Sequence, residues 1–136
     1  MIEQERLIEK AFLALEHAYA PYSGFQVGAC IQTRDDHYIL GANIENAAYG
    51  STNCAERSAV FAAYSMGYRK EDLKALAVVT RAKQITTPCG ACRQVLSELL
   101  NADTPIYLSN GIEVAVTNMK ELLPAGFGAD DLKSAN

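Results

Sequence analysis

Two segments of this chain begin on a cysteine and continue in residues typical of a helix. One reads CAERSAVFAAYSMGY from Cys54, and the other reads CGACRQVLSELL from Cys89, directly after Pro88. Cys92 follows Cys89 by three positions, a spacing typical of metal ligands. The N-terminus of a helix carries partial positive charge and free N–H groups, which lower the pKa of a thiol. If both helices begin at the same edge of a sheet, the sulfur atoms of Cys54, Cys89 and Cys92 can meet.

The hydrophobic pattern in the first two thirds of the chain predicts the other elements of that sheet. Apolar residues at i, i+4 and i+8 spacings predict a helix over residues 3–19, which Pro21 ends. Alternating apolar residues predict strands over 25–33 and 37–44. The nearly continuous apolar run at 73–80 predicts a buried strand.

The C-terminal part predicts a hairpin and a short helix. Asn110-Gly111 between PIYLS and EVAVT indicates a β-hairpin, with a two-residue turn as its simplest form. Asn118, followed three positions later by Glu121, is typical of a cap on a short helix, ELLP. We expect the small, polar tail from Gly128 onward to be loose. The order α-β-β-α-β-α-β-β-α predicts an α/β fold with a five-stranded mixed sheet covered by helices.

The composition limits the class of protein. A chain of 136 residues with 49% hydrophobic residues has the usual size of one globular domain, so we expect a single domain over 1–136. No apolar run approaches the roughly 20 residues of a membrane span, and the charged start is unlike a signal peptide. We therefore expect a soluble, cytoplasmic protein with no membrane partner. The net charge of −4 argues against a nucleic acid polymer and favours a small, uncharged substrate.

The number of cysteine ligands leaves two kinds of zinc site open. Structural zinc normally has four protein ligands, whereas catalytic zinc has three and keeps an open position for water. Cys30 could complete a structural site, but it lies in an alternating strand without a partner at ligand spacing. A free cysteine in such a strand is commonly a small core residue. The cysteines alone favour neither kind of site.

Glu56 favours the catalytic kind. It follows Cys54 by two positions, so its carboxylate could reach a metal-bound water and act as general base and acid without binding the metal. An isolated glutamate is usually solvated, but this one stands at the start of an alanine-rich helix that looks buried. Arg57 is either a surface cation or a charge that compensates the thiolates, because uncompensated buried charge is costly.

The segments Cys54-Ala55-Glu56-Arg57 and Pro88-Cys89-Gly90-Ala91-Cys92-Arg93-Gln94 together resemble the signature of the cytidine deaminase family, in its short, homotetrameric, three-cysteine branch. Further matches are YAPYS at 19–23, FQVGA at 25–29, GANIENA at 41–47 and ELLP at 121–124. The resemblance therefore covers nearly the whole chain.

This resemblance implies an α/β/α layered fold and an activity. The activity is zinc-dependent hydrolytic deamination of cytidine and 2′-deoxycytidine to uridine and 2′-deoxyuridine, with release of ammonia, in pyrimidine salvage. The implied cofactor is one Zn²⁺ per chain, held by Cys54, Cys89 and Cys92, with Glu56 as the proton shuttle. The implied assembly is a homotetramer.

The resemblance also implies which residues contact the substrate. Asn43 and Glu45 fall at the ribose contacts, Phe25 at the contact with the pyrimidine ring, and Ala55 at a further substrate contact. Phe127 matches an aromatic residue that reaches the pocket of a neighbouring subunit. From the residues alone, both phenylalanines would be assigned to the core.

Two classes of protein with other functions compete with this interpretation. Cys89-Gly90-Ala91-Cys92 at a helix start has the C-x-x-C form of a thiol-disulfide oxidoreductase, although such a protein has no use for Cys54 and Glu56. A zinc-stabilised binding module without catalysis would need Cys30 as a fourth ligand.

Overall fold

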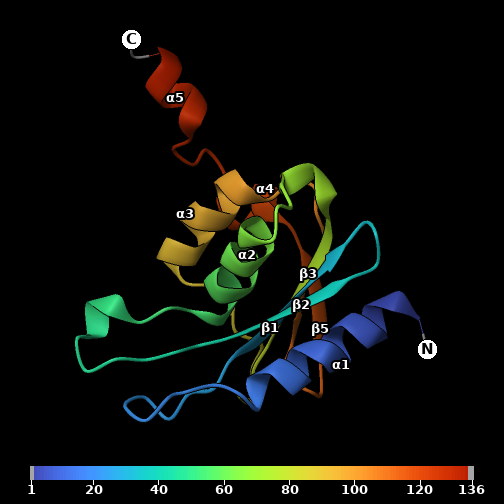
Figure 1. Ribbon diagram of the computed structural model, residues 1–136, viewed down its shortest axis with the longest axis vertical. Helices are drawn as coiled ribbons and strands as arrows, with labels where there is room; N and C mark the ends of the chain where they lie inside the picture. Colours follow the sequence, from blue (N-terminus) through green and yellow to red (C-terminus); the bar gives the residue numbers. More distant parts are fainter. Residues whose placement is uncertain (1, 135–136) are drawn as a thin grey trace.

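The computed structural model describes residues 2–134, in which five strands form one mixed sheet with helices on both faces (Figure 1). The strand order is β2-β1-β3-β4-β5; β3 and β4 pair in parallel, and all other neighbours are antiparallel. The strands are β1 (Gly28–Thr33), β2 (Tyr38–Ala42), β3 (Leu73–Val79), β4 (Ile106–Ser109) and β5 (Val114–Thr117). The helices are α1 (Glu3–Leu15), α2 (Ala55–Ser65), α3 (Gly90–Leu99), α4 (Met119–Leu122) and α5 (Ala129–Ser134), with short 3₁₀ helices at Tyr49–Ser51 and Lys70–Asp72.

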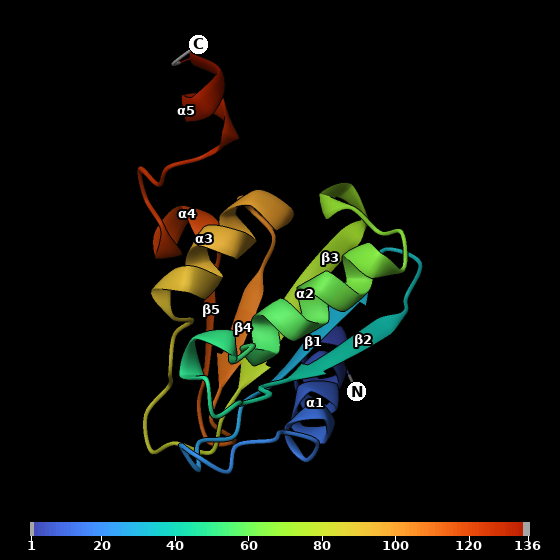
Figure 2. The ribbon, with the colours of Figure 1, turned by 60° about the vertical axis from the view of Figure 1, so that its left-hand side comes forward.

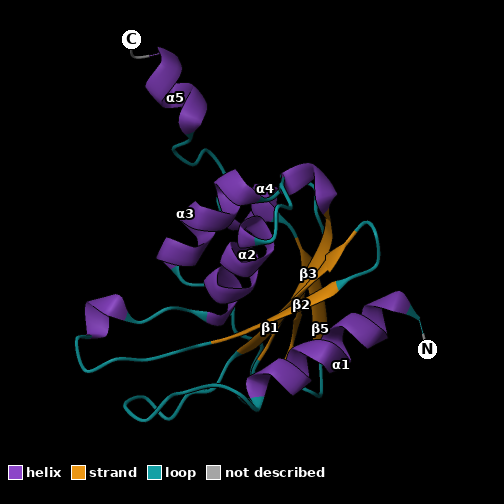
Figure 3. Ribbon diagram, viewed as in Figure 1, coloured by secondary structure: helices purple, strands orange, loops and turns teal. Residues whose placement is uncertain are grey.

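Strand β1 separates two hydrophobic clusters, because successive side chains of a strand point to opposite faces. Cys30 packs with Leu7 and Leu15 of α1, whereas Ala29 and Ile31 belong to the larger cluster formed with α2 and α3. Helix α1 therefore covers one face, and α2 and α3 cover the other, as the second view of the ribbon shows (Figure 2). Figure 3 shows the helices on both sides of the orange strands. The predicted α/β/α layers and five-stranded mixed sheet are confirmed.

Helix α2 packs very close to the edge strand β2 at Gly41. A Cβ atom added to Gly41 would lie 2.6 Å from the carbonyl oxygen of Ala55 and closer still to the backbone nitrogen of Ala59. No side chain fits at such a separation, so only glycine allows this contact. The contact holds the first turn of α2, directly after Cys54, against the sheet.

The first helix is shorter than predicted. Helix α1 ends at Leu15 instead of Tyr19, because the backbone of Tyr19 pairs with the segment that follows β2. The N–H of Tyr19 donates to the carbonyl of Asn43, and the carbonyl of Tyr19 accepts from the N–H of Glu45, both at 2.9 Å. These bonds replace the helical ones. They also bring Asn43 and Glu45 beside the end of α1.

Strand β1 also begins later than predicted, at Gly28 instead of Phe25. The side chain of Asn43 binds the backbone here: its Oδ1 accepts from the N–H of Val27, and its Nδ2 donates to the carbonyl of Phe25, both at 2.9 Å. This side chain takes bonds that a strand partner would otherwise make. The assignment of Phe25 to the core, made from the residues alone, is wrong, because Phe25 is 42% exposed.

The connection between β4 and β5 is wider than the simplest hairpin turn. Residues 110–113 join the two strands, so the loop has four residues instead of two. The Oδ1 of Asn110 accepts from the N–H groups of Ile112 (3.0 Å) and Glu113 (2.8 Å). This side chain satisfies the backbone of the wider turn.

Both C-terminal helices have a polar residue bound at their start. The Oδ1 of Asn118 accepts from the N–H of Glu121 (3.1 Å), which confirms the predicted cap of α4. The tail predicted to be loose contains α5, where the carboxylate of Asp131 accepts from the N–H of Gly128 (2.7 Å). Helix α5 stands away from the rest of the chain in both ribbon views (Figures 1 and 2). None of the described helices has the length and apolar character needed to cross a bilayer.

Candidate active site

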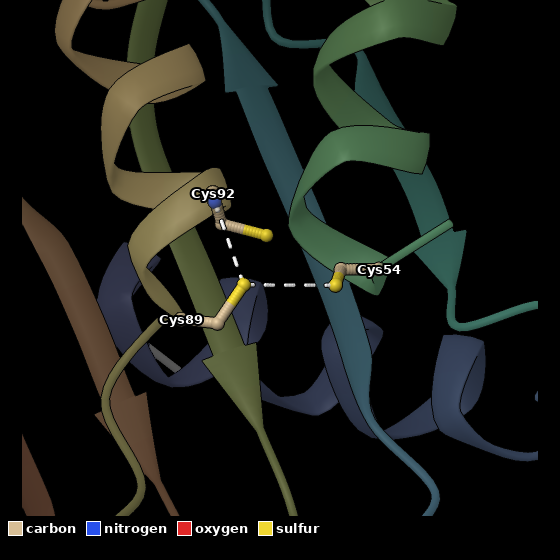
Figure 4. A group of neighbouring side chains, drawn as sticks. All are labelled: Cys54, Cys89 and Cys92. Atoms are coloured by element: carbon tan, nitrogen blue, oxygen red, sulfur yellow. Dashed lines mark hydrogen bonds between the residues drawn. The ribbon is translucent and has the colours of Figure 1, made fainter. Parts of the chain in front are cut away.

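Three cysteine side chains meet between the N-terminal ends of α2 and α3 (Figure 4). Cys54 is the N-cap residue of α2, and Cys89 is the N-cap residue of α3. The sulfur atoms of Cys54 and Cys89 are 3.9 Å apart, and those of Cys54, Cys89 and Cys92 all lie within 4.8 Å of one another. The N–H of Cys92 donates to the sulfur of Cys89 (3.5 Å). The convergence predicted from the sequence is confirmed.

Cys30 lies on the other face of the sheet. It is fully buried against α1, whereas Cys54, Cys89 and Cys92 lie at the start of α2 and α3. Burial raises the pKa of the Cys30 thiol to about 12, as expected for an inert core cysteine. Cys30 therefore cannot supply the fourth ligand that a structural zinc would need, and the three-cysteine site keeps one position open.

The pKa values of two cysteines in this cluster are shifted in opposite directions. A hydrogen bond with the thiol of Cys92 lowers the pKa of Cys54 to about 5, and Arg57 contributes in the same direction. The Nη2 of Arg57 donates to the sulfur of Cys54 at 3.3 Å, which also raises the pKa of Arg57. The same Cys54 contact, together with burial, raises the pKa of Cys92. The lowered pKa of Cys54 favours the thiolate form that zinc requires, and three sulfur donors beside a cation fit one zinc ion per chain.

Glu56 is buried although its side chain is acidic. It is the second residue of α2 and is 5% exposed. Burial is the main cause that raises its pKa, and the charge of Cys54 acts in the same direction. A raised pKa brings a carboxyl group closer to the range in which it can both accept and return a proton.

Glu56 and two of the cysteines line a pocket of about 270 Å³. Its lining includes every residue predicted to contact the substrate: Phe25, Asn43, Glu45 and Ala55. The other lining residues are Ser23, Val27, Thr52, Cys54, Glu56, Val78, Thr80, Thr86, Thr87 and Cys89. Phe127 lies outside this pocket, 58% exposed, beside a hollow formed with α4 and the residues that follow it.

Asn43 and Glu45 line this pocket, and their side chains also form hydrogen bonds to the segment 22–27, which we call the rim of the pocket. Asn43 binds the backbone of residues 25–27, as described above. The carboxylate of Glu45 accepts from the N–H groups of Tyr22 (3.1 Å) and Ser23 (3.0 Å) and from the hydroxyl of Ser23. The Ser23 bonds are the main cause that lowers the pKa of Glu45. Both residues therefore shape the segment 22–27 before any substrate binds.

Three polar residues of the site were not assigned a role from the sequence. Ser23 binds Glu45, and the hydroxyl of Thr52 is buried at the pocket without a hydrogen-bond partner in the described part of the chain. Arg93 donates to the carbonyls of Pro88 and Leu122 and to the hydroxyl of Thr87, each at 2.8 Å. Arg93 thereby fixes the loop that leads into Cys89. Its position directly after Cys92 was the available sequence signal.

Three sulfur donors with an open position, two of which line a pocket together with a buried carboxyl group, are the arrangement of a catalytic zinc site. Residues 1–108 match the family described as "Cytidine and deoxycytidylate deaminase zinc-binding region". A cytidine deaminase of Halalkalibacterium halodurans is 52% identical over 96% of this chain and 98% of its own length. One of Sporosarcina psychrophila is 46% identical over 98% of both chains.

A solved structure agrees with these sequence matches. The crystal structure of a cytidine deaminase from Burkholderia pseudomallei superposes with a TM-score of 0.89 at 46% identity, covering 93% of this chain and all of that one. The chain belongs to the cytidine and deoxycytidylate deaminase family. Cys89 and Cys92 are accordingly part of a zinc-binding signature, and the thiol-disulfide oxidoreductase interpretation is set aside.

Proposed function

We propose that this chain, acting as one domain over 1–136, hydrolyses cytidine and 2′-deoxycytidine to uridine and 2′-deoxyuridine, with release of ammonia. The observation that carries this proposal is the buried Glu56 carboxyl group in one pocket with Cys54 and Cys89. The same pocket is lined by Phe25 and Glu45, as a nucleoside site requires. The named cytidine deaminases, which match almost over their full length, support the choice of base and sugar.

Each side chain at the reacting end of the pocket has a role in this proposal. Cys54, Cys89 and Cys92 would hold the zinc ion, which when bound acts as a Lewis acid that lowers the pKa of water. Glu56 takes a proton from the attacking water as a C–O bond forms at C4 of the pyrimidine. Glu56 delivers this proton to N3, then takes the proton of the new hydroxyl on C4 and gives it to the departing amine, so that the C4–N bond breaks, C4 becomes a carbonyl and ammonia leaves.

Residues that line the pocket would bind the nucleoside. Phe25 packs against the pyrimidine ring, Ala55 contacts the base, and Asn43 and Glu45 bind the ribose. A carboxylate has about four positions that accept hydrogen bonds, and the Tyr22 and Ser23 contacts occupy three in Glu45. The remaining position can accept one hydroxyl. The 3′-hydroxyl is common to cytidine and 2′-deoxycytidine, which supports both as substrates.

The ribose assignment predicts that a phosphate on the 3′-oxygen slows turnover. A 3′-phosphodiester has no hydroxyl to donate and places negative charge against Glu45, which repels it. We expect ammonia release from cytidine and 2′-deoxycytidine, and rates lower by at least about tenfold for cytidine 3′-phosphate and a cytosine-containing single strand. Glu45→Gln should raise KM for cytidine by about tenfold and retain zinc. Comparable rates on all four substrates would contradict this role of Glu45.

Arg57 is proposed to compensate the charge of the three thiolates. Arg57→Ala removes the cation that lies 3.3 Å from the Cys54 sulfur, so we expect zinc affinity to fall by about 10–100-fold in a chelator competition. Arg57→Lys keeps the charge and should lose less affinity. Equal affinities for the wild type and Arg57→Ala would assign Arg57 to a structural role.

We further propose a homotetramer in which Phe127 reaches the pocket of a neighbouring subunit. The exposure of Phe127 and the position of α5 away from the rest of the chain support this assembly (Figures 1 and 2). We also propose that the protein operates in the cytoplasm, in pyrimidine salvage; a reducing compartment fits the cysteines of the described chain, none of which is in a disulfide. Light scattering of the wild type and of Phe127→Ala, combined with their KM values, tests the subunit contact.

A further inference from the structure

The hydroxyl group of Ser23 is hydrogen-bonded to two residues that line the pocket, Glu45 and Phe25. Ser23 Oγ donates to the carboxylate of Glu45 and accepts from the N–H of Phe25 at 3.0 Å. Glu45 is the proposed ribose ligand, and Phe25 is the proposed contact for the base. The hydroxyl of Ser23 therefore links the residue proposed to bind the ribose directly to the residue proposed to contact the base.

The backbone of Phe25 is held on both sides by side chains. Ser23 binds its N–H, and Asn43 binds its carbonyl. Between Ser23 and Phe25, Gly24 adopts a φ of +69°, which turns the chain back so that the Ser23 hydroxyl can reach the Phe25 amide. The backbone of Phe25, which lines the pocket, is thus fixed by both bonds; Asn43 was assigned a role from the sequence, whereas Ser23 was not.

We propose that Ser23 is a positioning residue that fixes Phe25 and Glu45 at the mutual distance a nucleoside requires. This inference rests on the proposed function, because it concerns the same pocket. Ser23 would act on binding by organising the rim in advance, which lowers the ordering cost of the complex. The hydroxyl contacts neither Glu56 nor the cysteines in the hydrogen bonds of the described chain, so the chemical step does not depend on it.

The kinetic test compares Ser23→Ala with two matched variants. Ser23→Ala should raise KM for cytidine by about tenfold, while kcat stays within about twofold and zinc is retained, because only uniform binding is lost. Ser23→Thr keeps the hydroxyl at an exposed position and should restore most of the affinity. Ser65→Ala, an exposed serine at the end of α2, should match the wild type. An unchanged KM in Ser23→Ala overturns the proposal.

The coupling between Ser23 and Glu45 gives a sharper result. If the hydroxyl acts in part through Glu45, the rise in KM of the double variant Ser23→Ala/Glu45→Gln should be smaller than the product of the rises in the two single variants. Fully additive effects on KM would show that Ser23 acts independently of Glu45 and would overturn the link.

Two measurements separate this inference from the proposed function, since neither needs turnover. Hydrogen–deuterium exchange of the ligand-free protein should be faster in Ser23→Ala over residues 20–28 and unchanged over α3. Calorimetric titration with uridine should show about tenfold weaker binding in Ser23→Ala. A wild type that binds uridine but releases no ammonia from cytidine contradicts only the proposed function. Unchanged exchange and unchanged uridine affinity in Ser23→Ala overturn the role of Ser23.

Discussion

Glu56→Gln is expected to keep its zinc and to lose about 10²–10⁴-fold in kcat for cytidine. The amide has the size and shape of the carboxyl group, so the buried first turn of α2 should still fold. It cannot take a proton from water or deliver one to the pyrimidine, so every proton transfer assigned to Glu56 is lost. Ammonia release and metal analysis on the same preparation measure both quantities.

The matched control is Glu98→Gln, which makes the same chemical change at an exposed position of α3. Its kcat and zinc content should equal those of the wild type. Near-normal turnover by Glu56→Gln would mean that the buried carboxyl group is structural. Loss of zinc together with activity would instead mean that Glu56 supports the metal site and would leave its proton transfer unproved.

Cys92→Ala is expected to lose most of its zinc and to reduce activity by more than about 10³-fold, whereas Cys30→Ala should retain both. The two cysteines make an informative pair because each is fully buried and each loses only a sulfur atom. Both variants should cost about 1–2 kcal/mol of stability through the cavity they leave. Zinc content, ammonia release and thermal unfolding of the two variants are the measurements.

Cys30→Ala and Cys92→Ala should differ in zinc content because the two cysteines lie on opposite faces of the sheet. Cys30 packs against α1, and the zinc cluster lies at the start of α2 and α3. If Cys30→Ala lost zinc while it remained folded, the metal would be bound differently from the cluster of Cys54, Cys89 and Cys92. The open position for a catalytic water would then be lost.

The convergence of the cysteines could be predicted because the sequence marks where each helix begins. Cys54 and Cys89 both precede runs of helix-forming residues, and both are N-cap residues in the structure. Strands β2, β3 and β4 run in the same direction, because β2 and β3 are both antiparallel to β1 and β4 is parallel to β3. Helices α2 and α3, which connect them on one face of the sheet, therefore start at the same edge. The family resemblance then identified the residues that line the pocket.

The hydrogen bonds of the rim could not be predicted from periodicity. The alternation from Phe25 onward is typical of a strand, yet the Asn43 side chain binds the backbone of residues 25–27 and delays the strand to Gly28. A bond between a side chain and a backbone 16 to 18 positions away leaves no repeating pattern in the sequence. The same applies to Ser23, whose bond to Glu45 spans 22 positions.

The close contact at Gly41 restricts the residue types allowed at position 41 as strongly as zinc binding restricts those at the ligand positions, although glycine has no functional group. Main-chain atoms of α2 lie directly on β2 there, so no flexible side chain can absorb an added methyl group. Cys54 and Glu56 both belong to the start of α2, whereas Cys89 and Cys92 belong to the start of α3. A larger residue at position 41 would displace the start of α2, and with it Cys54 and Glu56, relative to the α3 pair. In a map of tolerated substitutions, position 41 would therefore group with the catalytic residues instead of with the surrounding core.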